Sequence, residues 1–269
     1  MIKKVLSIAG SDCSGGAGSE ADLKTFAAHG VYGMCVIVSV VAENTARVIG
    51  SQDISPDIIE KQIDAVFEDI SPDAVKIGML SSPACMHAVA KKLKQYEPKN
   101  IVIDPVMVAK NGCPLMEPSA VGTLIKEILP FASVLTPNIP EAEKIAGIKI
   151  NSKNDMEKAA KLISKFGSGS VLVKGGHASG DALDVLFDGT DFRYYSEKRI
   201  NTKNTHGTGC TYSSAIASNL ALGFGLGEAV KRAKKYVTEA IRHSLAIGNG
   251  CGPTNHFYAL YKSGLKEEI

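Results

Sequence analysis

The chain has 269 residues and a formal net charge of +2, from 30 lysines and arginines against 28 aspartates and glutamates. This balance gives no basis for expecting nucleic acid or a membrane as the main partner, and no apolar run approaches the roughly 18 residues of a spanning helix. Six cysteines form no CxxC pair, and a chain of this length can build a core without disulfides. We therefore expect reduced thiols and a cytoplasmic protein.

Short β-branched apolar runs alternate with longer amphipathic stretches over the first two thirds of the chain. The first run is too short for a signal peptide and is interpreted as a strand. The predicted strands are 5–9, 35–42, 73–78, 100–107, 133–138 and 170–176. The predicted helices are 19–29, 56–69, 83–96, 118–129, 139–146 and 154–166. This order predicts an α/β fold with a mainly parallel sheet covered by helices on both faces.

The last third of the chain changes pattern. Residues 184–196 predict a β-hairpin with Asp-Gly in its turn, and two long helices follow at 208–223 and 226–246. No linker, repeat or low-complexity segment separates these parts, so we expect a single domain over residues 1–269.

Chemically capable residues stand where the predicted strands end. In chain order these ends are GSDCSGGAG, AENT, GML, DPVM, TPNIPEAE and KGGH. Ligands of parallel sheets bind outside the carboxyl ends of the strands. The sequence therefore predicts one site along that edge of the sheet.

Two kinds of glycine-rich segment need interpretation. Residues 16–21 match the G-x-G-x-x-[GA] pattern of dinucleotide-binding loops, with Glu43 as the acidic residue that should follow. That pattern normally follows its strand directly, whereas SDCSG intervenes here, so a flexible loop lining a small-molecule pocket is the simpler interpretation. Residues 174–177 and 207–210 suit anions, because backbone N–H groups of glycine loops and helix N-termini approach phosphate oxygens freely.

Cys210 lies where the helix of 208–223 is predicted to begin. A helix N-terminus favours the thiolate, so its pKa is expected to fall below the free value of about 8.5. The local sequence leaves three roles open for this thiol: nucleophile, general base or packing at the helix cap.

Six motifs follow one another through nearly the whole chain: GSDCSGGAGSEADLKTF (10–26), KIGML (76–80), DPVMVAK (104–110), TPNIPEAE (136–143), KGGH (174–177) and NTKNTHGTGCT (201–211). In this order they resemble the hydroxymethylpyrimidine/phosphomethylpyrimidine kinase family of the ribokinase superfamily. The resemblance implies a ribokinase-like three-layer αβα fold. It also implies phosphorylation of 4-amino-5-hydroxymethyl-2-methylpyrimidine and of its monophosphate, with ATP and Mg²⁺, by a homodimer. Pyridoxine/pyridoxal kinase is the nearest alternative; a nicotinamide-dependent oxidoreductase and a non-catalytic ligand-binding protein are more distant ones.

The same resemblance implies a role for each residue of the site. Cys210 would take the proton of the substrate hydroxyl, and the anion-binding turn beside it would be Gly207, Thr208 and Gly209. The predicted metal ligands are Asp104 and Glu141, and the residues predicted to bind ATP are Lys174, Asn138, Thr205 and His206. The pyrimidine would contact Gly10, Asp22, Val41, Glu43, Met79 and Val106.

Two further expectations concern Glu43 and a lid. Many family members have glutamine where this chain has Glu43, and an ionised glutamate can only accept hydrogen bonds. Residues 108–116 lie between the predicted strand 100–107 and the predicted helix 118–129, and they are the predicted lid.

Overall fold

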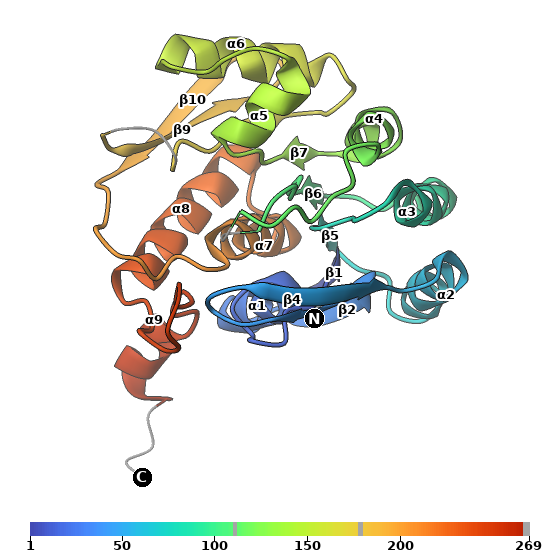
Figure 1. The fold of residues 1–269 in the computed structure, drawn as a ribbon, viewed down its shortest axis with the longest axis horizontal. Helices are drawn as coiled ribbons and strands as arrows, with labels where there is room; N and C mark the ends of the chain where they lie inside the picture. Colours follow the sequence, from blue (N-terminus) through green and yellow to red (C-terminus); the bar gives the residue numbers. More distant parts are fainter. Residues whose placement is uncertain (110–111, 177–179, 266–269) are drawn as a thin grey trace.

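An eight-stranded sheet runs through the centre of the protein, described here from a computed structural model for residues 1–109, 112–176 and 180–265 (Figure 1). Its strand order is β10-β9-β8-β7-β6-β5-β1-β2. The parallel strands are β1 (Lys4–Ala9), β2 (Tyr32–Ile37), β5 (Ala74–Ile77), β6 (Ile101–Ile103), β7 (Val134–Leu135) and β8 (Val171–Val173). The antiparallel strands at one edge are β9 (Ala182–Phe187) and β10 (Phe192–Glu197), which confirms the predicted hairpin. The predicted α/β fold with a mainly parallel sheet is confirmed.

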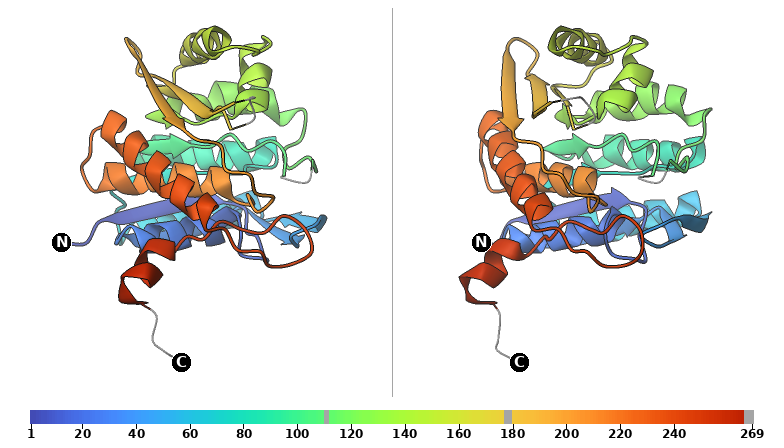
Figure 2. Two further views of the ribbon diagram at one scale, coloured as in Figure 1. Left: turned by 90° about the vertical axis from the view of Figure 1, so that its left-hand side faces the viewer. Right: turned by 60° about the vertical axis from the view of Figure 1, so that its left-hand side comes forward.

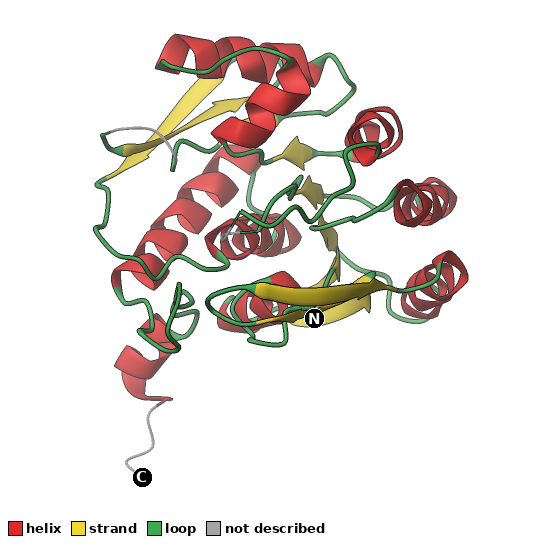
Figure 3. Cartoon of the chain, viewed as in Figure 1, coloured by secondary structure: helices red, strands yellow, loops and turns green. Residues whose placement is uncertain are grey.

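Helices cover both faces of this sheet and give three layers (Figures 1 and 3). One face carries α2 (Pro56–Phe67), α3 (Pro83–Tyr96), α4 (Ala120–Thr123), α5 (Ile139–Ala146) and α6 (Lys153–Ser164). The other face carries α1 (Gly18–Ala28), α7 (Thr208–Ala221) and α8 (Leu226–Arg242). Figure 2 shows α8 crossing the sheet beside the β9–β10 hairpin, which it contacts through β10.

Strand alternation divides the buried side chains between two apolar cores. Along β5, for example, Val75 and Ile77 pack in the core under α2 and α3, whereas Ala74 packs in the core under α7. Successive side chains of a strand point to opposite faces, so Lys76 shares the α7 face with Ala74. This placement of a lysine inside the protein matters for the site described below.

Three predicted elements differ from the structure. The run 35–42 is not one strand: β2 ends at Ile37, and β3 (Ser39–Glu43) leaves the main sheet to pair with β4 (Val48–Asp53). The predicted strand 100–107 stops at Ile103, before a proline that cannot donate to the ladder. The predicted helix 118–129 is α4 followed by a π-helical turn, Leu124–Ile128, and a 3₁₀ turn, Leu129–Phe131.

The C-terminal part adds a short helix that the sequence did not suggest, α9 (Tyr258–Leu260), which continues as a π-helical turn, Tyr261–Leu265. Among the described residues, no helix combines the length and apolar character that crossing a membrane requires. The single domain over 1–269 stays a prediction.

Candidate active site

A cavity of about 810 Å³ lies at the carboxyl ends of the parallel strands. Five strands each bring a residue to its wall just beyond their last residue: Gly10, Met79, Asp104, Asn138 and Lys174 follow β1, β5, β6, β7 and β8. This confirms that the strand ends gather along one edge. The two ends of the cavity differ in chemistry. We call the end lined by Val41, Glu43 and Met79 the ring end, and the end lined by Asp104, Glu141 and Lys174 the phosphate end.

The ring end combines apolar walls with one carboxyl group. Val41, Met79 and Val106 line the cavity there, and Val41 and Met79 are buried. Glu43, at the end of β3, lines the same cavity. Such a set of flat apolar walls with one placed polar group suits a heteroaromatic ring.

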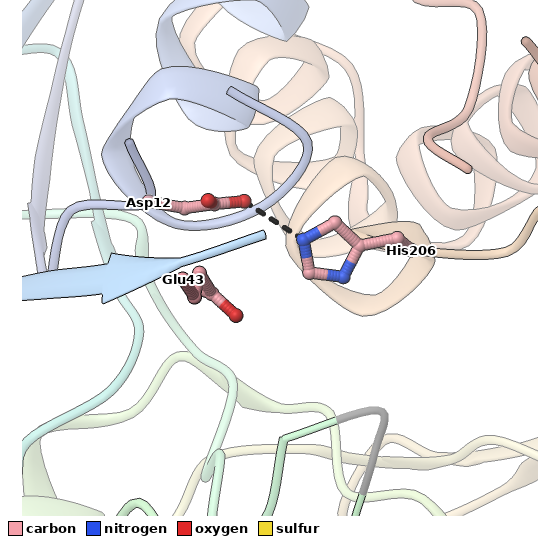
Figure 4. Close-up of side chains that lie close together, drawn as sticks. All are labelled: Asp12, Glu43 and His206. Atoms are coloured by element: carbon pink, nitrogen blue, oxygen red, sulfur yellow. Dashed lines mark hydrogen bonds and ion pairs between the residues drawn. The ribbon is translucent and has the colours of Figure 1, made fainter. Parts of the chain in front are cut away.

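Two buried residues, Asp12 and His206, lie close to Glu43 (Figure 4). Asp12 Oδ2 accepts hydrogen bonds from His206 Nε2 at 2.8 Å, from Ala17 N at 2.8 Å and from Gly16 N at 3.0 Å. Burial would raise the pKa of Asp12, but its hydrogen bonds, led by that from His206, hold the pKa well below its usual value. Asp12 therefore organises the loop after β1 and ties it to the segment before α7.

His206, which was predicted to bind ATP, lines the cavity and lies beside Asp12 and Glu43, and its role toward ATP stays a prediction. The carboxylates and the imidazole come within 4.8 Å of one another, a spacing that would also allow a cation. The hydrogen bond between Asp12 and His206 explains why these two groups meet, and we assign no metal here.

Glu43 has an altered acidity in this position. Burial, followed by the negative charge of Asp12, raises its pKa to about 7, although His206 opposes the shift. A carboxyl group with this pKa exists in both protonation states near neutral pH, so it can donate as well as accept a hydrogen bond.

The phosphate end is built on an ion pair between elements far apart in sequence. Lys174 Nζ donates to Asp104 Oδ1 at 2.6 Å, and Asp104 is only 2% exposed. Burial would lower the pKa of Lys174, but the charges of Asp104 and Glu141 outweigh it and raise the pKa. Lys174 is therefore a fixed cation inside the cavity.

Glu141 and Asn138 form the first turn of α5 as a capping box. Asn138 Oδ1 accepts from Glu141 N at 2.9 Å, and Glu141 Oε2 accepts from Asn138 N at 2.8 Å. Burial raises the pKa of Glu141 to about 7, with Lys174 opposing and Asp104 adding to the shift. Both capping residues line the cavity, as predicted for ligands of the nucleotide and its metal.

The first turn of α7 closes the phosphate end. Gly207 is its N-cap with φ of 74°, and a Cβ there would collide with the carbonyl oxygen of Gly16. A Cβ at Gly209 would lie 3.1 Å from Asp104 Oδ2 and 3.5 Å from Lys174 Nζ. Only glycine allows the backbone of this turn to approach the ion pair so closely, and Thr205 and Thr208 line the cavity beside it. The free N–H groups of a helix start in this position can receive a phosphoryl group.

Cys210, in the same turn, lines the cavity, but its predicted acidity is wrong. Burial raises the pKa of its thiol to about 11, despite the opposing charge of Lys76 and a hydrogen bond with the backbone of Gly18. The helix N-terminus was expected to lower this pKa. Loss of solvation on burial outweighs that effect.

Asp22 is the predicted substrate residue that the structure does not bring to the cavity wall. It is 0% exposed and accepts hydrogen bonds from Ser7, Lys76 and Ser214. Lys76 lines the cavity instead, and no role was predicted for it. A lysine inside the apolar strand run DAVKIG was the available signal.

Other cavity residues were also missed. One wall is formed by the segment after β10 and by α8, through Lys198, Ile200, Val237 and Ile241. Of the predicted lid, residues 110–111 lie outside the described residues, and Val108, Ala109 and Leu115 line the cavity. His177 of the KGGH motif also lies outside the described residues.

Comparison with known proteins gives consistent matches. The family model described as phosphomethylpyrimidine kinase matches residues 12–255. The chain is 48% identical over 256 residues to the thiamine biosynthesis bifunctional protein ThiED of Geobacter sulfurreducens, covering 95% of this chain and 52%, about half, of that relative. It is 45% identical over 258 residues to the hydroxymethylpyrimidine/phosphomethylpyrimidine kinase of Bacillus subtilis, covering 95% of each chain.

A solved structure, the ADP complex of Bacillus subtilis pyridoxal kinase, matches with a TM-score of 0.91 at 38% identity, covering 97% of this chain and 99% of that one. The three-layer architecture is thus ribokinase-like. With most of its length matched by the family model and by relatives well above 30% identity, the chain belongs to the phosphomethylpyrimidine kinase family.

Proposed function

We propose that this kinase transfers the γ-phosphoryl group of ATP to the hydroxymethyl group of 4-amino-5-hydroxymethyl-2-methylpyrimidine, and then a second one to the monophosphate. The observation that carries the proposal is one cavity shared by Cys210, the Lys174–Asp104 pair and Glu43. A base, a phosphate-binding cation and a polar group for a ring are the parts that such a transfer needs. The kinase relatives favour this hypothesis over a nicotinamide-dependent oxidoreductase and over a non-catalytic binder.

In this mechanism the chain mainly positions groups and balances charge. The N–H groups at the start of α7, together with Lys174, bind the transferring phosphoryl group. The substrate oxygen forms its bond to phosphorus as the bond from phosphorus to the leaving oxygen of ADP breaks. The thiolate of Cys210 takes the hydroxyl proton and later releases it to solvent. Its high pKa makes the thiolate scarce near pH 7 but a strong proton acceptor.

Magnesium is the proposed metal, and the residues at the phosphate end suit it. Asp104 Oδ2 accepts no hydrogen bond from the described residues, and Glu141 lines the cavity beside it. Mg²⁺ is bound through one or two carboxylates together with phosphate oxygens and waters. When bound, it would neutralise charge on the ATP phosphates. Asp104 and Glu141 would hold it, and the capping box would keep Glu141 in place.

Phosphorylation of pyridoxal is the second candidate function, because the matched solved structure with a TM-score of 0.91 is a pyridoxal kinase. Glu43 favours the pyrimidine instead. In its neutral form it can donate to a ring nitrogen while accepting from the 4-amino group. An aminopyrimidine offers both partners side by side.

Two further properties belong to the proposal. We place the enzyme in the cytoplasm, where ATP is available and a thiol such as Cys210 stays reduced. We also propose a homodimer. The β3–β4 hairpin exposes Val40 and Ile49, at 50% and 66%, next to the residues that line the ring end. A second copy covering this hairpin would remove that apolar surface from water.

An ADP-release assay with hydroxymethylpyrimidine, its monophosphate and pyridoxal in parallel tests the function. The expected result is turnover of both pyrimidines at higher kcat/KM than pyridoxal, with the diphosphate identified by mass spectrometry. Faster turnover of pyridoxal would replace the proposal by its second candidate. Native mass spectrometry of the same sample tests the homodimer.

A further inference from the structure

A charged cluster lies buried between the sheet and two helices, directly next to the cavity. Lys76 Nζ donates to Asp22 Oδ2 at 2.8 Å, and both side chains are 0% exposed. Ser7 Oγ donates to the same oxygen at 2.6 Å, and Ser214 Oγ donates to Asp22 Oδ1 at 2.7 Å. Ser7 and Lys76 are neighbours in the β1–β5 register, Asp22 comes from α1 and Ser214 from α7. We call these four residues the floor cluster.

Burying an ammonium and a carboxylate is costly, and apolar residues of similar size are often at least as stabilising. The cluster is also incomplete. An ammonium has three donors, and Asp22 is the one hydrogen-bond partner of Lys76 Nζ among the residues that the structure describes. Packing of the fold therefore does not explain why a lysine occupies position 76.

The floor cluster is attached to the same face of α7 as Cys210. Ser214 follows Cys210 by four residues, so the two side chains lie one above the other on the helix. The hydrogen bond from Ser214 to Asp22 thus fixes α7 one turn after the thiol. Lys76 itself lines the cavity that Cys210 lines.

Charge on Lys76 also acts on the sulfur. The charged groups that act on Cys210 are Lys76 from β5, Asp22 from α1, Asp104 after β6 and Lys174 after β8. Among those that shift the thiol, Lys76 has the largest effect and favours the thiolate, whereas Asp22 and Asp104 disfavour it.

We propose that Lys76, held in place by Asp22, is a positioning residue that orients Cys210 and stabilises its thiolate for the transfer. This inference depends on the proposed function for the role of the thiolate. Cys210 gives its proton to solvent before the reaction, takes the substrate hydroxyl proton as the oxygen–phosphorus bond forms, and returns to the thiol. Lys76 stays protonated throughout, and its positive charge replaces the water that the enclosed sulfur has lost.

The test is the variant Lys76→Met, with Lys92→Met as its matched control. Lys92 is also a buried lysine paired with a carboxylate, at 2.7 Å from Asp64, but it lies on α3 away from the cavity. Two quantities are measured: kcat and KM for the pyrimidine, and the rate at which iodoacetamide alkylates Cys210 at pH 9, followed on the Cys210 peptide. Alkylation needs neither ATP nor substrate, so it stays informative even if the proposed function is wrong.

Lys76→Met is expected to slow alkylation of Cys210 at least about tenfold, since loss of a close charge shifts a pKa by one or more units. The value of kcat should fall by a similar factor with little change in KM, whereas Lys92→Met should change neither. Alkylation and kcat at wild-type values in Lys76→Met would overturn the proposal.

The single variant leaves Asp22 buried without its cation and can fail to fold, so the double variant Asp22→Asn/Lys76→Met decides in that case. It removes both charges and should fold. The double variant differs from the single variant Asp22→Asn only by the charge of Lys76, so alkylation should be slower in the double variant than in Asp22→Asn. Equal alkylation in these two folded variants would show that the cluster serves only packing.

Discussion

The ring end and the phosphate end of the cavity each contain a carboxyl group, but the surroundings of the two carboxyl groups differ. At the phosphate end, Asp104 and Lys174 neutralise each other at 2.6 Å, and glycines of α7 bring backbone N–H groups beside them. At the ring end, Glu43 forms no ion pair with the residues that the structure describes, and its pKa is raised to about 7. The proposed function assigns the phosphate to the phosphate end whatever the acceptor is, and it assigns the choice of acceptor to the ring end. Changes at the two ends should therefore have separable effects.

The largest effect is expected where the two ends meet, at Cys210. Cys210→Ala should lower kcat by about 10²- to 10⁴-fold for every acceptor, the usual loss for an acid–base group. ATP binding, measured by calorimetry, should be unchanged. Cys210→Asp restores a proton acceptor and should recover part of the activity. If the alanine variant turned over at the wild-type rate, the thiol would serve only for packing.

A change confined to the phosphate end should lower turnover of every acceptor by the same factor. Lys174→Met removes the cation of the ion pair and should lower kcat/KM for ATP by about 10²- to 10³-fold, as for one lost charge-stabilising donor. The ratio of pyrimidine to pyridoxal turnover should stay constant. Thermal unfolding is the control, because Asp104 is left buried without its cation. A variant that alters acceptor preference would break the division into two ends.

The two ends also differ in how far the sequence could predict them. The phosphate end follows from strand ends and helix starts, which local patterns reveal, so Asp104, Asn138 and Lys174 were placed correctly on the cavity wall. The ring end depends on a contact between Asp12 and His206, which lie 194 positions apart. No local pattern indicates such a contact, so the pairing of His206 with Asp12 was missed.

Acidity and local geometry were the hardest features to predict. The pKa of Cys210 was expected to be low because helix position is visible in the sequence, whereas enclosure by other elements is not. The break after Ile37 was missed because the apolar run 35–42 continues through it. Lys76 was overlooked because one lysine in a strand does not show which face it occupies.

A change at the ring end should alter the acceptor and its pH dependence. The raised pKa of Glu43 keeps part of it protonated below about pH 7, and this donor is lost as the pH rises through that value. The KM for the pyrimidine should therefore rise above pH 7 in the wild type. Glu43→Gln should keep the activity and give a flat profile, because an amide donates at every pH.

Glu43→Met tests the same group by removing both hydrogen bonds. It should lose roughly tenfold in kcat/KM for the pyrimidine, the effect expected of one or two hydrogen bonds. Turnover of pyridoxal should change less. Equal rates for the wild type, Glu43→Gln and Glu43→Met would remove Glu43 from recognition of the ring.

The smallest expected effect on activity comes from changing a helix cap. Two caps, one at the cavity and one away from it, distinguish loss of stability from loss of site geometry. Asn138 caps α5 beside the cavity, and Ser152 caps α6 by accepting a hydrogen bond from Asp155 N at 3.2 Å. Either residue changed to alanine should lose about 1 kcal/mol in the free energy of unfolding, measured with urea. Asn138→Ala should also lower kcat/KM for ATP about threefold to tenfold, because the freed first turn of α5 no longer fixes Glu141. Ser152→Ala should leave kcat/KM unchanged, since Ser152 is exposed and does not line the cavity. An equal loss of activity in both variants would mean that general stability, and not the position of Glu141, limits the phosphate end.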